Sequence, residues 1–156
     1  MWQRTLLAIF VTALLIRSVF IFTLQNGFYF PDSLDYSQAA TSLLAHGTFG
    51  EAYDRPPMYP LVLAAIYALF GQHIVAIRLV QAVMGACIAV LIALIARRLG
   101  SKGVGVLAGV LWSVYPLGVF MAGFEYPTSV ITLLLAATAL PQSAALSALS
   151  RAPMRG

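Results

Sequence analysis

The chain has few charged residues, and acidic residues are the scarcest of them. Of its 156 residues, nine are Lys or Arg and five are Asp or Glu, whereas 61% are hydrophobic. A soluble domain of this length needs more polar surface than these residues supply. Long apolar runs recur along the sequence, so we expect an all-α, polytopic membrane protein built as a helical bundle.

Cysteine and histidine are also scarce. Cys87 is the only cysteine and lies inside an apolar run, which excludes an intrachain disulfide and indicates a buried, unreactive thiol. The two histidines, His46 and His73, do not have the spacing of metal ligands. The sequence therefore predicts no metal site, and nothing in it indicates a bound cofactor.

The apolar runs predict four membrane spans, at about residues 5–24, 74–96, 104–123 and 126–140. A further apolar stretch at residues 60–71 has about 11 residues before its glycine, which gives about 16 Å of helix. Because a hydrocarbon core is about 30 Å thick, we expect this stretch to be a juxtamembrane helix. The N-terminal run could also be a cleaved signal peptide. It continues beyond Arg17 without a small-residue cleavage site, which favours a retained span.

Basic and acidic residues separate to opposite ends of this bundle. The basic end carries Arg4, Arg97, Arg98, Lys102, Arg151 and Arg155, and the acidic end carries Asp32, Asp35, Glu51, Asp54 and Glu125. The positive-inside rule then predicts a cytoplasmic N-terminus and an external loop at residues 25–73. Because the basic residues flank spans and form no patch with interleaved aromatics, we expect no nucleic-acid partner. Residues 1–140 would form one membrane domain, and residues 141–156, rich in Ser, Ala and Pro, an irregular cytoplasmic tail.

The predicted external loop holds four of the five acids and begins with a helix signal at Asp32 or Ser33. One face of this helix is an apolar stripe, formed by Tyr36, Ala39, Ala40, Leu43 and Leu44. Asp32 is either a helix N-cap or a general base for an acceptor hydroxyl, because partial desolvation at the membrane surface would raise its pKa. Asp35, one turn further, is either a solvated acid or a support for that base.

Basic residues near this loop are candidates for binding a phosphate. Arg55 precedes two prolines, which hold the backbone extended and aim the planar guanidinium in one direction. The alternative is a surface pair with Asp54 or Glu51. Arg78, one turn into its span, either binds an anionic headgroup or extends to the interface, and Arg17, which lies deeper, should face the bundle or a polar cavity. Glu125 either joins Asp32 in an acidic cluster or is an interfacial acid.

Three stretches together resemble a known family. They are "PDSLDYSQAATSLLAHGTF", "YDRPPMYPLVLAAIYALFG" and "AIRLVQAVMGACIAVLIALIARRLG". In this order they are similar to the N-terminal part of the C-type integral-membrane glycosyltransferases, in particular the protein mannosyltransferase and aminoarabinose transferase branch (dolichyl-phosphate-mannose-protein mannosyltransferase-like proteins). The resemblance covers about residues 5–140. It implies juxtamembrane helices at about 32–46 and 60–70.

The resemblance also implies an activity. Such enzymes transfer a sugar from a polyprenyl phosphate carrier to an acceptor hydroxyl on the external face, with inversion at the anomeric carbon. Asp32 and Tyr36 match the acid and the tyrosine of the family's first-loop motif, and Arg55 matches the residue that holds the carrier phosphate. Ser33 and Thr128 stand where many members carry acids.

The implied location is a bacterial inner membrane, with the carrier lipid and an acceptor lipid, glycan or protein as partners. Family members usually have eight or more spans, so this sequence corresponds to an N-terminal part. Two alternatives stay open, a non-catalytic module that binds or transports the lipid carrier and an inactive structural remnant.

Overall fold

The computed structural model describes residues 1–50 and 53–151, and in this part of the chain all regular structure is helical. The helices are α1 (Trp2–Thr23), α2 (Pro31–His46), α3 (Met58–Phe70), α4 (Ile74–Leu99), α5 (Lys102–Val114), α6 (Pro116–Ala122) and α7 (Thr128–Arg151). The predicted all-α fold is confirmed.

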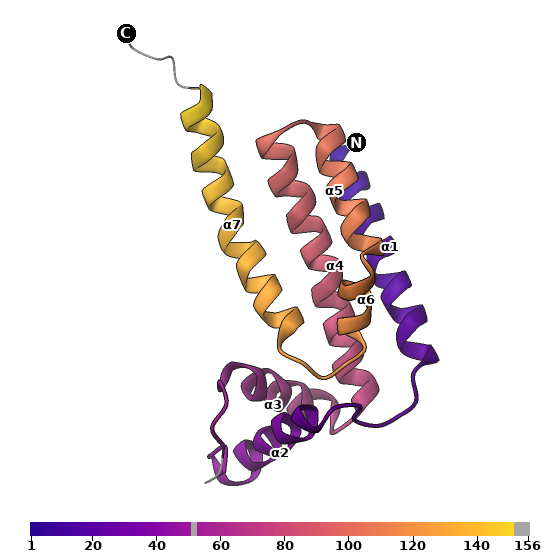
Figure 1. Ribbon diagram of the computed structural model, residues 1–156, viewed down its shortest axis with the longest axis vertical. Helices are drawn as coiled ribbons and strands as arrows, with labels where there is room; N and C mark the ends of the chain where they lie inside the picture. Colours follow the sequence, from indigo (N-terminus) through magenta and orange to yellow (C-terminus); the bar gives the residue numbers. More distant parts are fainter. Residues whose placement is uncertain (51–52, 152–156) are drawn as a thin grey trace.

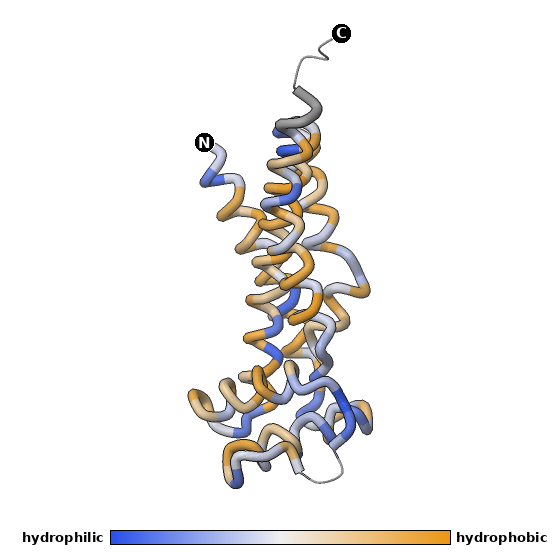
Figure 2. The backbone as a smooth tube through the Cα atoms, turned by 90° about the vertical axis from the view of Figure 1, so that its left-hand side faces the viewer, coloured by the Kyte–Doolittle hydropathy of each residue, from blue (hydrophilic) through white to orange (hydrophobic). Residues whose placement is uncertain are grey.

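The long helices form an elongated bundle, and two shorter helices lie across one end of it. Figure 1 shows α1, α4, α5–α6 and α7 along the bundle, with α2 and α3 together at what we call the loop end. Helix α4 is central and packs against α1, α5 and α7. Hydrophobic residues predominate along the bundle, whereas hydrophilic residues gather at the loop end (Figure 2). This distribution is typical of a membrane protein.

Helices α1, α4 and α7 are each long and apolar enough to cross a membrane, and α5 with α6 makes a fourth, bent candidate. Helix α3 has 13 residues, about 20 Å of helix, which is too short to cross a core of about 30 Å. The chain is thus an integral membrane protein with two juxtamembrane helices, as predicted. The start of α1 and the junction of α4 and α5, which carry Arg4, Arg97, Arg98 and Lys102, lie at the end of the bundle opposite the loop end (Figure 1). Glu51 and Arg155 lie outside the described residues.

The predicted span at residues 104–123 is not continuous. Helices α5 and α6 are bent by 52° at Tyr115, whose backbone is extended with φ −61° and ψ 116°. Pro116 explains the break, because proline has no N–H to donate to the Trp112 carbonyl and disfavours helical geometry in the residue before it. The prediction of one uninterrupted helix was wrong because it did not weigh this proline.

Arg17 supplies hydrogen bonds that the break removes. Its buried guanidinium donates to the carbonyl oxygens of Trp112 and Ser113, both at 3.3 Å, and to that of Ala13 at 3.0 Å. A Cβ atom on Gly85 would collide with the Arg17 side chain, so this glycine makes room for it. The C-terminal end of α5 also favours a cation, because helix carbonyls converge there. Arg17 faces the bundle, as predicted, and its hydrogen-bond partners are backbone carbonyls of the protein.

Substituting Arg17 should therefore destabilise the bundle. We expect Arg17→Met to lower the free energy of unfolding by about 1–3 kcal/mol, the usual effect of leaving buried polar groups without a partner. The change is measured by unfolding in detergent micelles. Arg4→Met, which removes an exposed arginine from the same helix, is the matched control and should change stability little. Equal stability of the Arg17→Met variant and the wild type would contradict the role of Arg17 at the break.

Helix α7 extends beyond its predicted end. It runs from Thr128 to Arg151 and contains Pro141, so the irregular tail predicted for 141–156 is wrong for 141–151. Ala, Leu and Ser carry the helix through this segment, and isolated prolines are tolerated in membrane helices where side chains satisfy nearby carbonyls. Pro141 leaves the Ala137 carbonyl without its helical donor. Beside this proline, Arg98 of α4 and Ser143 both donate to the Leu140 carbonyl, at 2.6 Å each, and the Arg98 contact ties α7 to α4 there. Residues 152–156 of the predicted tail lie outside the described residues.

Candidate functional site

Asp32 lies in the first turn of α2 but does not cap it. The helix begins at Pro31, with Phe30 as its N-cap residue, and no side chain caps the backbone there. Proline suits this first position because its fixed φ matches the helix and its missing N–H costs no hydrogen bond. The N-cap alternative for Asp32 is therefore wrong, and its carboxylate is available for other partners.

Three charged side chains meet at this end of α2. The Nη2 atom of Arg55 lies 2.9 Å from Oδ1 of Asp32 and 2.8 Å from Oδ2 of Asp35. All three side chains are partly exposed, between 31% and 46%. The two acids are three positions apart in one helix, so they share a face and both reach a single guanidinium. We call Asp32, Asp35 and Arg55 the charged triad.

The loop before α3 fixes the direction of Arg55. Pro56 and Pro57 follow it, and the hydroxyl of Tyr53 donates to the Pro56 carbonyl at 3.1 Å. The guanidinium also lies over the ring of Tyr36, 5.6 Å from its centre, a distance suited to a cation–π contact. Arg55 thus pairs with α2, not with its neighbour Asp54 as the alternative expected. Glu51, the other expected partner, lies outside the described residues.

Apolar packing holds α2 in place behind the triad. Tyr36, Ala39 and Ala40 of the predicted stripe are buried and Leu43 is partly buried, whereas Leu44 is half exposed. Tyr36 packs edge-on against Tyr59 of α3 with ring centres 5.1 Å apart. Four of the five residues of the predicted stripe therefore pack against the protein. The triad stands on an apolar cluster formed by α2, α3 and the ends of α4 and α7 nearest the loop end.

The structure lowers the pKa of Asp32 where the sequence predicted that it would rise. The bond from Arg55 is the largest cause and the hydrogen bond from the Tyr126 hydroxyl, 2.7 Å from Oδ2, is the second; desolvation opposes both but is smaller. The same contacts raise the pKa of Arg55 and that of Tyr126. Asp32 is thus a stable carboxylate with two donors in this state.

Removing Arg55 should reverse this shift. In the Arg55→Gln variant we expect the pKa of Asp32 to rise towards its ordinary value of about 3.9. Because the folded-state pKa is lowered, the Asp32–Arg55 contact stabilises the fold above the unfolded pKa and is lost as the pH falls through the folded value. Carbon-13 NMR of labelled aspartate carboxyls measures the titration. An unchanged Asp32 titration in Arg55→Gln would show that the pair does not set this pKa.

Arg78 and Glu125 form a second, fully buried ion pair. The Nε atom of Arg78 lies 2.9 Å from Oε1 of Glu125, with exposures of 1% and 0%. The two remaining Arg78 nitrogens donate to the carbonyls of Gln25 at 3.0 Å and Gly27 at 2.8 Å. Burial raises the pKa of Glu125, and Arg78 opposes that rise. Arg78 therefore does not extend to the interface, and Glu125 is neither an interfacial acid nor the partner of Asp32.

The buried Arg78–Glu125 pair helps to position Tyr126, a site residue that the sequence did not reveal. Gln81, one turn along α4 from Arg78, donates to the Phe124 carbonyl at 2.8 Å, so α4 holds the 123–127 segment at two points. Tyr126 then reaches Asp32 and packs against Phe30 with ring centres 5.6 Å apart. Arg78 and Gln81, polar residues three apart in an apolar helix, were the available signal for a buried contact.

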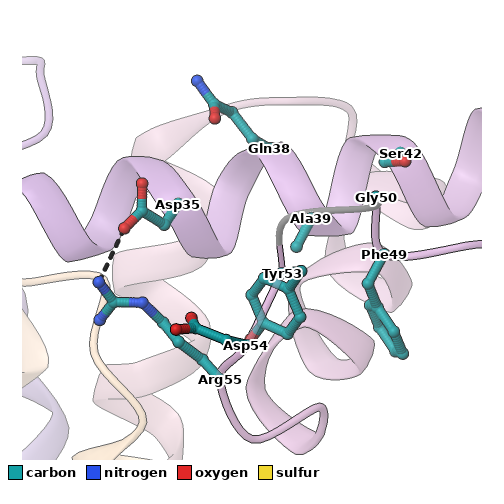
Figure 3. A pocket seen from close by; sticks show the side chains of 9 residues that line it. All are labelled: Asp35, Gln38, Ala39, Ser42, Phe49, Gly50, Tyr53, Asp54 and Arg55. Atoms are coloured by element: carbon teal, nitrogen blue, oxygen red, sulfur yellow. Dashed lines mark hydrogen bonds and ion pairs between the residues drawn. The ribbon is translucent and has the colours of Figure 1, made fainter.

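Two hollows are lined by residues of the site or by their neighbours in the chain. The first, which we call the α2 cleft, has a volume of about 410 Å³ and is polar; Figure 3 shows α2 on one side and the segment carrying Phe49 and Tyr53 on the other. The second, the Tyr36 groove, has a volume of about 340 Å³ and is apolar. It is lined by Tyr36, Pro56, Met58, Tyr59, Pro127, Val130, Ile131, Leu134 and Leu135. Arg55 and Asp35 line the cleft, whereas Tyr36 and Pro56 line the groove.

Within residues 1–50 and 53–151, no group of three His, Cys, Asp or Glu side chains is arranged to hold a metal ion. The two carboxylates of the triad converge on an arginine. The site therefore offers two carboxylates, a guanidinium and two tyrosine side chains, and its residues border a polar cleft and an apolar groove.

Comparison with known proteins gives one family. The sequence model described as dolichyl-phosphate-mannose-protein mannosyltransferase matches residues 54–151, more than half of the chain. Searches of curated proteins and of solved structures give no significant match. The matched segment includes Arg55, Arg78 and Glu125 and begins after Asp32. The family match therefore does not cover Asp32, Asp35 or Tyr36, and the roles assigned to them rest on the geometry of the site.

Proposed function

The chain belongs to the dolichyl-phosphate-mannose-protein mannosyltransferase family, and on this basis we propose that it uses a polyprenyl phosphate sugar as donor for transfer to an acceptor hydroxyl. The observation that carries the proposal is the position of Arg55. Its guanidinium contacts Asp32 and Asp35, lines the polar cleft and lies over the ring of Tyr36, which lines the apolar groove.

Each part of such a donor has a matching surface. A prenyl chain is apolar and suits the Tyr36 groove, which opens between α3 and α7. A phosphate at the mouth of this groove meets Arg55, whose planar fork presents paired donors to phosphate oxygens. Arg78 and Arg17, the other phosphate candidates, donate to internal partners, so we assign them structural roles.

The proposed reaction is a single displacement. The acceptor oxygen attacks the anomeric carbon as the bond from that carbon to the phosphate oxygen breaks. The proton of the acceptor hydroxyl passes to the Asp32 carboxylate, and the carrier phosphate leaves with its negative charge opposed by Arg55. One base is sufficient because no covalent sugar–enzyme intermediate forms, and attack from the face opposite the phosphate inverts the anomeric carbon.

Binding of the donor would also raise the pKa of the base, Asp32. In the free site Arg55 lowers the pKa of Asp32 and makes it a weak base. A phosphate competes for the Arg55 donors and adds negative charge near Asp32, and both effects raise the pKa of a carboxylate. Asp32 thus becomes a stronger base when the donor is present. Asp35 retains part of the guanidinium contact and supports its position.

The charge distribution supports a location. Basic residues at the end opposite the triad favour a cytoplasmic position for that end, which supports the proposal that the triad lies on the external side of a membrane. That this membrane is a bacterial inner membrane is part of the proposal and follows from the family resemblance. The two alternatives make different predictions. A module that only binds the carrier needs Arg55 but not Asp32, and an inactive remnant needs neither.

Carrier binding at Arg55 is testable without turnover. Undecaprenyl phosphate at 100 times its dissociation constant should stabilise the wild-type chain by about 2.7 kcal/mol. We expect Arg55→Gln to lose most of this stabilisation and Arg55→Lys to keep part of it, because lysine retains the charge but not the fork. Thermal unfolding in nanodiscs, with and without the carrier, measures both. Equal stabilisation of wild type and Arg55→Gln would exclude Arg55 as the phosphate ligand.

A further inference from the structure

The α2 cleft shares no lining residue with the Tyr36 groove, and neither the carrier lipid nor its phosphate accounts for it. We propose that it is the acceptor subsite and that it takes a neutral, hydroxyl-rich sugar ring; this assignment as an acceptor site rests on the proposed function above. The volume of about 410 Å³ is within the range of ligand sites, about 300–1,000 Å³.

The lining of the cleft combines hydrogen-bonding groups with flat apolar faces. Asp35 and Ser42 from α2 and Asp54 from the facing segment offer oxygen acceptors or a hydroxyl. Phe49 and Tyr53 contribute rings with centres 5.6 Å apart, tilted by 32° (Figure 3). A sugar ring has the matching surfaces, because its hydroxyls exchange hydrogen bonds at the rim while its C–H face packs on aromatic carbon.

The charge of the α2 cleft and its position beside the triad restrict the class of ligand further. Asp35 and Asp54 both line the cleft, and among the described residues Arg55 is the one basic side chain that lines it, already paired with Asp32 and Asp35. An anionic ligand would meet net repulsion here, so the lipid phosphate belongs on the groove side. A hydroxyl in the cleft beside Asp35 and Arg55 lies next to Asp32, the proposed base. The donor and the acceptor thus approach the triad through different hollows.

Ligand-observed saturation-transfer NMR on the chain in nanodiscs tests the assignment. The probes are maltotriose, mannotriose and chitotriose as neutral sugars, the tripeptide Ala-Thr-Ala as a peptide and spermidine as a cation. We expect wild type to bind at least one trisaccharide. Ser42→Trp, which fills the cleft, and Phe49→Leu, which removes an aromatic face but keeps apolar volume, should each weaken binding about tenfold. His46→Ala, an exposed position on the same helix outside the cleft, should bind like wild type.

The assignment is overturned if no trisaccharide binds, if binding persists in Ser42→Trp, or if the tripeptide or spermidine binds in place of the sugars. Stabilisation by undecaprenyl phosphate is measured on the same variants and should be unchanged in Ser42→Trp. Absence of sugar binding by the wild type, with intact carrier stabilisation, contradicts the cleft assignment alone. Absence of carrier stabilisation in wild type contradicts the proposed function, and the cleft would then not be an acceptor site.

Discussion

Asp32→Asn should abolish sugar transfer while leaving the fold intact. The amide cannot accept the proton of the acceptor hydroxyl, so the expected loss is that of a general base, about 10²–10⁴-fold in rate. Asparagine has nearly the same shape, and its side-chain oxygen can still accept a hydrogen bond from Tyr126 or Arg55. Membrane insertion and thermal unfolding should therefore match the wild type. Label transfer from a polyprenyl phosphate sugar in membranes containing the chain measures the rate.

Two matched variants separate the base from its surroundings. Asp35→Asn removes the other carboxylate that contacts Arg55 and should reduce transfer much less, because Asp32 keeps its own contacts. Tyr126→Phe removes the hydroxyl at 2.7 Å from Asp32 and should raise the pKa of that carboxyl without removing it. If Asp35→Asn lost as much activity as Asp32→Asn, the base could not be assigned to Asp32.

Breaking the buried Arg78–Glu125 pair should have the largest effect on stability. Arg78→Met leaves the Glu125 carboxylate buried without its cation and removes donors from the carbonyls of Gln25 and Gly27. Loss of one partner from a buried pair costs about 3–5 kcal/mol. Chemical unfolding in detergent micelles measures this change. Transfer should fall as well, because the 123–127 segment would no longer hold Tyr126 against Asp32.

The double variant Arg78→Met/Glu125→Leu is the critical comparison. Apolar replacement of both partners of a buried pair is often close to neutral, so it should recover most of the stability lost in Arg78→Met. Arg98→Met removes an exposed arginine that donates to the Leu140 carbonyl and is the control, with an expected change within about 1 kcal/mol. A double variant as unstable as Arg78→Met would mean that the carbonyl contacts, not the ion pair, hold this end of the bundle.

The sequence predicted the parts of the fold that depend on length and apolar content. The spans α1 and α4 and the short helix α3 follow from how many apolar residues stand between polar or glycine boundaries. The break at Tyr115 and the extension of α7 through Pro141 were mispredicted, since the local sequence does not say whether a proline ends a helix. Arg17 donates to the Trp112 carbonyl that Pro116 leaves without its helical donor, and Arg98 contacts α7 beside Pro141; no local pattern reveals either contact.

The candidate site was predictable in its membership but not in its pairing. Asp32 and Arg55 could be selected because acids are rare in this chain and a double proline fixes the arginine. Tyr126 could not, because its contact with Asp32 depends on Arg78, Gln81 and the 123–127 segment. The direction of the Asp32 pKa shift was predicted wrongly for the same reason. A sequence pattern can indicate that a residue is desolvated, but it does not indicate that Arg55 and Tyr126, from remote segments, both donate to Asp32.

The most direct test of the proposed reaction is the stereochemistry of transfer by the wild-type chain. A polyprenyl phosphate sugar of defined anomeric configuration, labelled at the anomeric carbon, is supplied to membranes that contain the chain, and the product linkage is determined by NMR. The site predicts that label enters the product with inverted configuration and that Asp32→Asn membranes yield none. Retained configuration, or no transfer by the wild type, would contradict a single displacement at the charged triad.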